Sequence, residues 1–177
     1  MTFFLGEAFE KGFFMRDYIK FLAKTGIIAA LYTVLTLLVL PLASGAIQIR
    51  VSEGLCLLPL LFVEAIPGLA VGCLISNLIT GCALFDILLG SLVTLVSAVF
   101  TFFVGKIIKS IPLKIIIGGL FPVVLNAVFL PLIWSVCYGA GQYVYVVQAL
   151  LLVVGQGVSV YGVGTPVYLK LKNTTRK

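Results

Sequence analysis

Histidine is absent from the chain, and charged side chains make up only 10% of its 177 residues. Because histidine is the commonest general base and the commonest metal ligand, its absence counts against most hydrolytic and metal-assisted chemistry. The four cysteines lie in apolar stretches without a CxxC pair, so we interpret them as packing residues and expect no metal site. A phosphate-binding loop is also missing: Gly105 and Lys106 are present, but the motif needs glycine where Phe100 stands and serine or threonine where Ile107 stands. We therefore expect no enzymatic activity and no cofactor in this chain, with any ATP-driven work done by another chain.

Apolar residues dominate what is present. They make up 62% of the chain, and the mean hydropathy is +1.24, far above that of soluble globular domains. No run alternates polar and apolar residues over about ten positions, as membrane barrel strands do. A helical crossing takes about 20 residues, which leaves room for four to seven. The composition predicts an all-α integral membrane protein.

Six apolar stretches are predicted as membrane helices of one domain: 22–42, 54–65, 67–82, 86–105, 115–138 and 143–169. The second and third are short for a hydrocarbon core of about 30 Å. We expect them to tilt, to thin the bilayer or to lie partly behind other helices, or else to form one long span with a re-entrant segment. Residues 1–21 interleave phenylalanines with charges, which predicts an interfacial helix on the cytoplasmic face and not a signal peptide.

The basic residues indicate the topology. Lys106, Lys109 and Lys114 lie in one connection, and residues 170–177 carry four further cations. The positive-inside rule places this connection and the basic tail, 171–177, in the cytoplasm. An even number of spans places both basic clusters on the cytoplasmic side. We therefore expect six helices over 22–170 with both termini cytoplasmic. This distribution, between spans, also counts against nucleic acid as a partner.

Ionisable residues at membrane depth are expensive, which makes each one a functional candidate. Arg50 and Glu53 lie three residues apart, so in a helix they share a face, where they can pair or meet a polar ligand. The alternative is a helix start in which Ser52 is the cap and the helix dipole favours Glu53. We favour the functional interpretation, because a cap alone does not explain Gln48 and Arg50 in so apolar a chain.

The two remaining acidic candidates differ in position. Asp86 begins the fourth predicted span on the outer side, where an N-cap and a ligand contact are equally good interpretations. Glu64 lies in a short inner turn, where a solvated position or a partner contact is favoured over substrate.

Uncharged polar and aromatic side chains supply further candidates. Amides within or beside the spans either join helices or bind a solute: Gln48, Asn77, Asn126, Gln148 and Gln156. Aromatic residues near the outer ends of the last two spans form either an interfacial belt or a stacking surface for a flat ring: Trp134, Tyr138, Tyr143 and Tyr145.

Small residues recur four apart in the first and third predicted spans, where they permit helices to approach closely. This spacing fits internal packing and docking to another subunit equally well. The pairs are Gly26 with Ala30, Ala29 with Thr33, and Gly68 with Gly72.

Four segments together carry a family resemblance: IQIRVSEGLCLLPL, IPGLAVGCLISNL, GCALFDILLGSLVTL and GQGVSVYGVGTP. Over residues 22–170 the chain resembles the QueT family, the substrate-binding S components of energy-coupling factor (ECF) transporters. The resemblance implies six transmembrane helices in a bacterial plasma membrane and a queuosine precursor or salvage base, such as queuine, as ligand. It also implies three partner chains, a transmembrane coupling subunit and two cytosolic ATPases that use the ATP.

The resemblance also assigns roles to residues. A first-helix pattern of small residues contacts the coupling subunit in such proteins, which here implicates Gly26, Ala29, Ala30 and Thr33. A deazaguanine ring offers adjacent N–H donors that suit a carboxylate, either Glu53 or Asp86. Supporting polar and stacking contacts are then expected from Arg50, Gln48, Asn126, Gln148, Gln156, Trp134 and Tyr143.

Three other functions compete with this one. The same architecture could bind another vitamin-like solute, or the chain could be a membrane scaffold whose polar residues only join helices. An intramembrane enzyme with Glu53 and Asp86 as paired carboxylates is the weakest hypothesis, because no nucleophile motif and no histidine accompany them.

Overall fold

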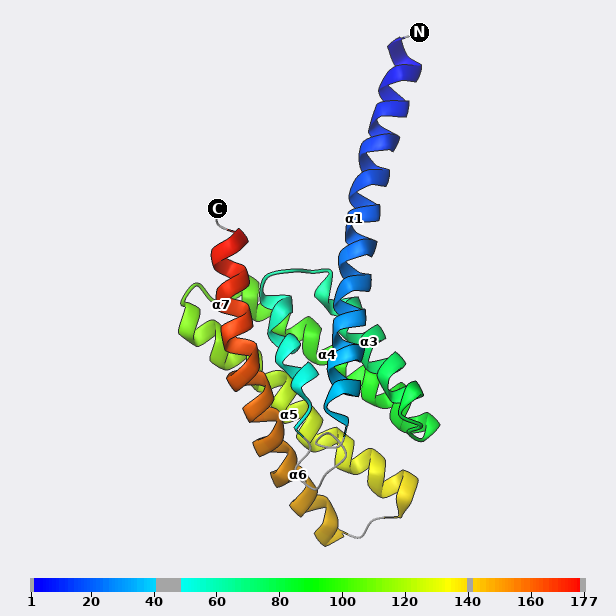
Figure 1. The fold of residues 1–177 in the computed structure, drawn as a ribbon. Coiled ribbons are helices and arrows are strands. Elements are labelled where there is room, and N and C mark those ends of the chain that lie inside the picture. The colour runs from blue at the N-terminus through cyan, green and yellow to red at the C-terminus, as the bar shows by residue number, and fades with distance from the viewer. Residues whose placement is uncertain (1, 41–48, 140–141, 176–177) are drawn as a thin grey trace.

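The computed structural model describes residues 2–40, 49–139 and 142–175, with side chains throughout except at residues 2–14, 138, 142, 143 and 175. All regular structure in these ranges is helical. The elements are α1 (Thr2–Leu38), the 3-10 helix η1 (Val51–Leu60), α3 (Ala65–Ile79), α4 (Leu84–Ile107), α5 (Ile111–Tyr138), α6 (Gln142–Gly157), the π-helical segment η2 (Val158–Val163) and α7 (Gly164–Thr175). The last three form one continuous rod (Figure 1).

Among the described residues, four helical segments are long and apolar enough to cross a bilayer: Met15–Leu38, Leu84–Ile107, Ile111–Cys137 and Val144–Thr174. At 1.5 Å per residue, a 24-residue segment such as Leu84–Ile107 is about 36 Å long, more than the roughly 30 Å of a hydrocarbon core. The prediction of an all-α membrane protein is therefore confirmed. Six complete crossings, with both termini in the cytoplasm, remain a prediction.

The two short predicted spans differ from the prediction. Residues 54–65 were expected to form an ordinary helix, but η1 is a 3-10 helix of 10 residues, about 20 Å long, which ends at Leu60. Every residue from Ser52 to Leu60 is buried, because η1 contacts α1, α3, α4, α5, η2 and α7. It occupies the centre of the bundle, where Figure 1 shows it in cyan, and so lies behind the other helices as one alternative had predicted. The next helix, α3, has 15 residues and is about 22 Å long.

The N-terminal segment also differs from the prediction. Residues 1–21 were expected to form an interfacial helix separate from a span starting at residue 22. Instead α1 runs without a break from Thr2 to Leu38, and its first half projects beyond the rest of the bundle (Figure 1). No glycine, proline or cap stands between Met15 and Leu22 to end the helix, which explains its continuity.

Glycines set the closest contacts of the central helix. A Cβ on Gly164 would lie 2.5 Å from the Gly54 carbonyl oxygen, so η1 and α7 touch through their backbones. Leu60, at the other end of η1, packs against Gly105 and Gly118. These small residues let η1 sit among its neighbours at backbone distance, which fixes its position along the bundle.

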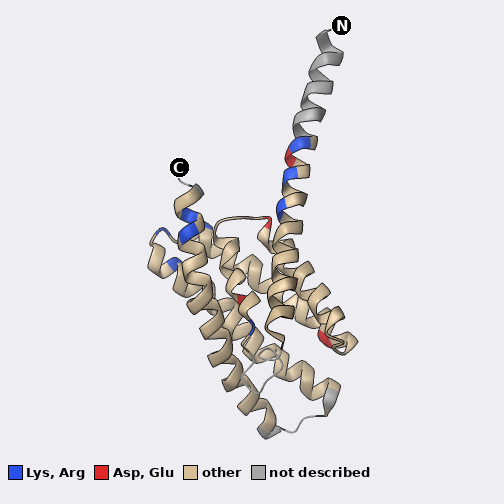
Figure 2. Cartoon of the chain, viewed as in Figure 1, with Lys and Arg blue, Asp and Glu red and all other residues tan. Residues whose placement is uncertain are grey.

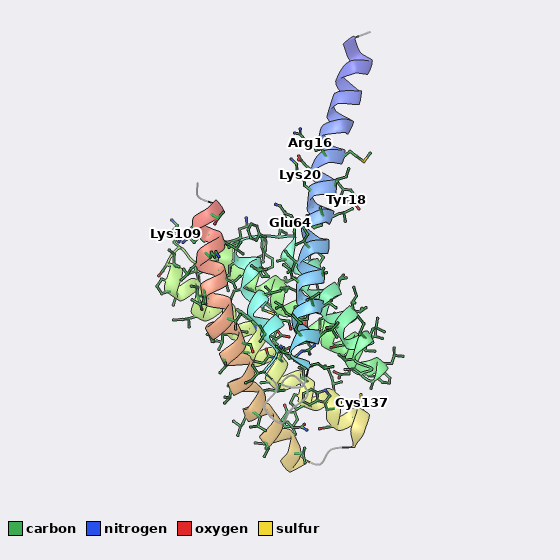
Figure 3. The ribbon with its side chains drawn as sticks, in the orientation of Figure 1. Arg16, Tyr18, Lys20, Glu64, Lys109 and Cys137 are labelled. Carbon is green, nitrogen blue, oxygen red and sulfur yellow. The ribbon has the colours of Figure 1, made fainter. Side chains whose placement is uncertain are left out.

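Several basic residues lie at the end of the bundle that carries the C-terminus (Figure 2), and Lys109 lies at this end (Figure 3). Lys24 forms an ion pair of 2.8 Å with Glu64 there, and Lys114 Nζ donates to the Gly105 carbonyl at 2.8 Å. Partial burial acts to raise the pKa of Glu64, but the hydrogen bond from Lys24, a backbone hydrogen bond and the charge of Lys24 together lower that pKa below its ordinary value of 4.5. Under the positive-inside rule this end is the one predicted to be cytoplasmic.

Candidate functional site

Glu53 is the centre of a hydrogen-bonded group inside the bundle. Its side chain is 2% exposed. Tyr32 Oη of α1 donates to Oε1 at 2.5 Å, and Oε2 accepts from Cys56 Sγ at 3.1 Å and from Asn126 Nδ2 of α5 at 3.4 Å. A 3-10 helix has three residues per turn, which places Cys56 directly beside Glu53 on the same face. The carboxylate is therefore engaged by donors from three different helices.

Arg50 does not pair with Glu53 as its spacing suggested. Its guanidinium donates to Asn77 Oδ1 of α3 at 3.0 Å, and the ion pairs of the described residues do not join it to Glu53. The alternative in which Ser52 caps the start of a helix is also wrong. The N-cap of η1 is Arg50, and the Ser52 hydroxyl instead accepts a hydrogen bond of 2.7 Å from Thr36 Oγ1. Arg50 still interacts electrostatically with Glu53.

Asp86 is held by an aromatic side chain. The N-cap of α4 is Ala83, so Asp86 lies in the first turn and is not the cap. Trp134 Nε1 of α5 donates to Asp86 Oδ2 at 3.2 Å, and the Asp86 side chain is 8% exposed. A Cβ on Gly90 would lie 3.5 Å from Asn77 Nδ2 and 3.6 Å from Asp86 Oδ1. This glycine therefore separates two polar groups that belong to one cluster.

Two glutamines of α6 have buried amide atoms without hydrogen-bond partners among the described residues. Gln156 is fully buried, and neither its amide nitrogen nor its oxygen has a hydrogen-bond partner among the described residues; the same holds for Gln148 Oε1. Leu152, one turn from each of them, packs against Ala127 and Leu130 of α5. The inward face of α6 thus meets the α5 face that carries Asn126 and Trp134. A buried amide that lacks a partner costs about 1–3 kcal/mol per group, so this face is suited to a polar ligand.

The structure joins some of the predicted site residues to one another. Asn126 bonds Glu53 and Trp134 bonds Asp86, whereas Arg50 bonds Asn77, and Gln156 and Gln148 Oε1 have no hydrogen-bond partner among the described residues. The prediction for Gln48 falls outside the described residues, and so do those for the side chains of Tyr138 and Tyr143. Tyr145 Oη donates to the Val128 carbonyl at 3.1 Å and so joins α6 to α5.

Sequence reasoning missed two residues that hold Glu53. Tyr32 is fully buried in α1, and Cys56 is 3% exposed in η1. One feature of the sequence indicated a polar role for Tyr32, namely that its hydroxyl lies within an apolar span near Thr33 and Thr36. Cys56 was interpreted as a packing residue, and nothing in its neighbourhood along the chain indicated that its thiol donates to a carboxylate.

The small residues of α1 divide between two faces. Gly26 and Ala30 are exposed, and a Cβ on Gly26 would meet no atom within 4 Å. Ala29 and Thr33 are buried against α3, where Thr33 Oγ1 donates to the Gly72 carbonyl at 3.2 Å. The prediction that Ala29 and Thr33 contact a partner subunit is therefore wrong, because α3 already covers them.

A hollow of about 370 Å³ lies between α4 and α5. It is lined only by apolar side chains, and much of its wall is exposed on the outside of the bundle, as at Phe85 and Val136. An apolar hollow of this kind suits lipid, so it is not the site for a polar solute.

Comparison with known proteins identifies the family. The family model described as QueT transporter matches residues 22–173. No curated protein and no solved structure shows significant similarity to the chain. The match covers the second half of α1 and nearly all of the chain from there to the end of α7, including the polar residues around η1, α5 and α6. The chain therefore belongs to the QueT transporter family of membrane transport proteins.

Proposed function

We propose that this chain is the substrate-specific S component of an ECF-type importer, and that it binds a queuosine precursor or salvage base, such as queuine, from outside. The observation that carries the proposal is the face of α6, where Gln148 and Gln156 bury amide atoms that have no partner among the described residues. They face an α5 that carries Asn126 and Trp134. A polar ligand between these helices would supply the missing hydrogen bonds.

The geometry favours Asp86 over Glu53 as the carboxylate that contacts the base. Glu53 accepts from three protein donors and is nearly inaccessible. Asp86 lies in the first turn of α4, and the connection from α3 to α4 lies away from the end of the bundle that carries the C-terminus (Figure 1), near the entrance expected for a ligand from outside; its Oδ1 lies beside Gly90, which has no side chain. A carboxylate there can accept adjacent N–H groups of a deazaguanine ring. Trp134, held by its N–H, offers its ring for stacking.

Delivery to the cytoplasm would depend on partner chains. Without a phosphate-binding motif, this chain leaves ATP hydrolysis to two cytosolic ATPases that act through a transmembrane coupling subunit. The outward face of α1 at Gly26 and Ala30 supports docking of that subunit, because open space there permits close helix approach. A bacterial plasma membrane is the matching location.

The unpartnered amides also weigh against a scaffold. If polar residues served only to join helices, Gln156 would be expected to bond a neighbouring helix, as Asn126 does with Glu53. Another vitamin-like solute remains the second candidate for the ligand, because the same groups can bind other polar rings.

Calorimetric titration of the detergent-purified chain tests this function. Queuine should bind saturably, whereas riboflavin, thiamine and guanine serve as comparison ligands. Gln156→Leu should weaken binding, and Val154→Ala, on the exposed face of the same helix, should leave it unchanged. Binding of riboflavin or thiamine instead of queuine would shift the proposal to the second candidate, and no binding by folded protein would favour the scaffold.

A further inference from the structure

The apolar hollow between α4 and α5 is elongated along both helices. On each helix its main lining residues lie four, three and four positions apart, so each helix contributes one continuous face. From the first to the last of these positions the rise along a helix is about 16 Å. The residues are Phe85, Leu89, Leu92 and Val96 of α4, and Leu125, Phe129, Leu132 and Val136 of α5.

The hollow occupies one half of the membrane. It begins where the bond from Trp134 to Asp86 joins the ends of α4 and α5, and it stops near the middle of α4. At the opposite ends of these two helices, Lys114 Nζ donates to the Gly105 carbonyl beside the basic connection. The positive-inside rule therefore places the hollow in the outer half of the bilayer. Its length of about 16 Å matches half of a hydrocarbon core of roughly 30 Å, which is the depth of one leaflet.

Hydrocarbon is the material that suits this hollow. All eleven residues that line it are apolar, whereas a trapped water needs about two to four polar partners. Left empty, the walls lose the dispersion contacts that a filled space would give them. Because α4 and α5 each have the length and composition of a membrane span, the medium outside the open wall is lipid. The hollow is thus continuous with the surface that these helices present to the bilayer.

We propose that this hollow is a binding site for one acyl chain of an outer-leaflet phospholipid. The chain lies extended along the hollow, with its carbonyl end between Phe85 and Val136 and its methyl end between Val96 and Leu125. Protein walls contact it from two helices, so this lipid exchanges more slowly than the lipids around the bundle. The site holds whatever solute the chain transports, because no polar residue of the candidate site lines the hollow.

Photocrosslinking of the unmodified full chain tests the site. The purified chain is reconstituted in phosphatidylcholine vesicles that contain a small fraction of phosphatidylcholine with a diazirine on one acyl chain, either near the carbonyl or near the methyl end. After irradiation, mass spectrometry of peptides measures the label on each residue. Leu89 lines the hollow and its neighbour Leu88 does not, so Leu89 should carry several-fold more label although it is less exposed, 40% against 52%.

The two probes also report the direction of the chain. The diazirine near the carbonyl should label Phe85 and Val136, and the diazirine near the methyl end should label Val96 and Leu125. A matched pair of variants then locates the label. Val93→Phe places a ring in the hollow and should remove the excess label at Leu89, whereas Val128→Phe adds the same ring at an exposed position outside the hollow and should leave the excess unchanged.

Several results would overturn the proposal. Equal label on Leu88 and Leu89 would show that the hollow holds no lipid beyond those that surround the bundle. An order of the two probes opposite to the expected one would overturn the assignment to the outer leaflet. Excess label that persists in folded Val93→Phe protein would overturn the assignment to the hollow, and a dimeric chain with the hollow unlabelled would assign this face to a second copy. The comparison of Leu88 with Leu89 on the unmodified chain needs no variant to fold.

Discussion

Replacing Gln156 by leucine should stabilise the empty protein and weaken ligand binding. Gln156 is fully buried, and both of its amide atoms lack partners among the described residues. Each such group costs about 1–3 kcal/mol, and leucine of similar size removes both while it keeps the packing beside Leu152. Allowing for imperfect packing, we expect about 2 kcal/mol of added stability. For a chain of this length, this corresponds to a rise in Tm of roughly 4–8 °C.

The assay is thermal unfolding in detergent with and without queuine. The variant should unfold at a higher temperature than the original chain when ligand is absent, and queuine should raise its Tm by less. Asn126→Leu provides the contrast, because Asn126 donates to Glu53 and its loss should lower the Tm. A Gln156→Leu protein that is destabilised and still binds queuine with unchanged affinity would refute the reasoning, since the amide would then serve only the fold.

Three further substitutions test the surrounding structure. Glu53→Gln should destabilise the protein by about 2–3 kcal/mol, because the new amide nitrogen would face donors such as Tyr32 Oη. Denaturation in detergent measures this change, and an unchanged midpoint would contradict the role assigned to the hydrogen bonds around Glu53. Gly72→Ala should lower stability by about 1–3 kcal/mol, since the new Cβ would lie 2.8 Å from the Tyr32 Cβ and force α1 from α3; wild-type stability would show that the helices separate freely. Glu64→Gln should cost less than about 1 kcal/mol, because Lys24 is half exposed. The ion pair lowers the pKa of Glu64, so its contribution is present above the ordinary value of 4.5 and disappears as the pH falls through the lowered value. Stability measured across this acid range should fall less in the Gln variant.

Long apolar runs allowed the best predictions of the fold. The stretches 86–105 and 115–138 correspond closely to α4 (Leu84–Ile107) and α5 (Ile111–Tyr138), because a run of that length and composition fits one structure in a bilayer. The geometry of η1 was not predictable in the same way. Its sequence has no period specific to a 3-10 helix, and its backbone contact at Gly164 comes from a segment more than 100 positions away along the chain.

The sequence predicted which residues belong to the candidate site, but it did not predict which residues they bond. Arg50, Glu53 and Asp86 stand out because a charge is rare in so apolar a chain. Their partners come from distant helices: Trp134 reaches Asp86 across 48 positions. Spacing along one helix suggested a pair between Arg50 and Glu53, but the tertiary arrangement turned Arg50 to Asn77 instead. Local spacing predicts which residues share a face and cannot decide which neighbour that face meets.

The two interior carboxylates, Glu53 and Asp86, differ in the hydrogen-bond donors that surround them, and this difference bears on the role of each. Glu53 lies on the most enclosed helix and is balanced by donors from α1, η1 and α5, so a ligand there would have to break bonds that already exist. Asp86 lies in the first turn of α4, where Trp134 and Cys82 donate to it, and the unsatisfied polar atoms are instead those of Gln148 and Gln156, so a ligand beside α6 adds bonds. Binding energy comes from contacts that the empty protein lacks. On this basis we propose that Glu53 holds the helices that form the site, and that Asp86 and the two glutamines of α6 contact the ligand.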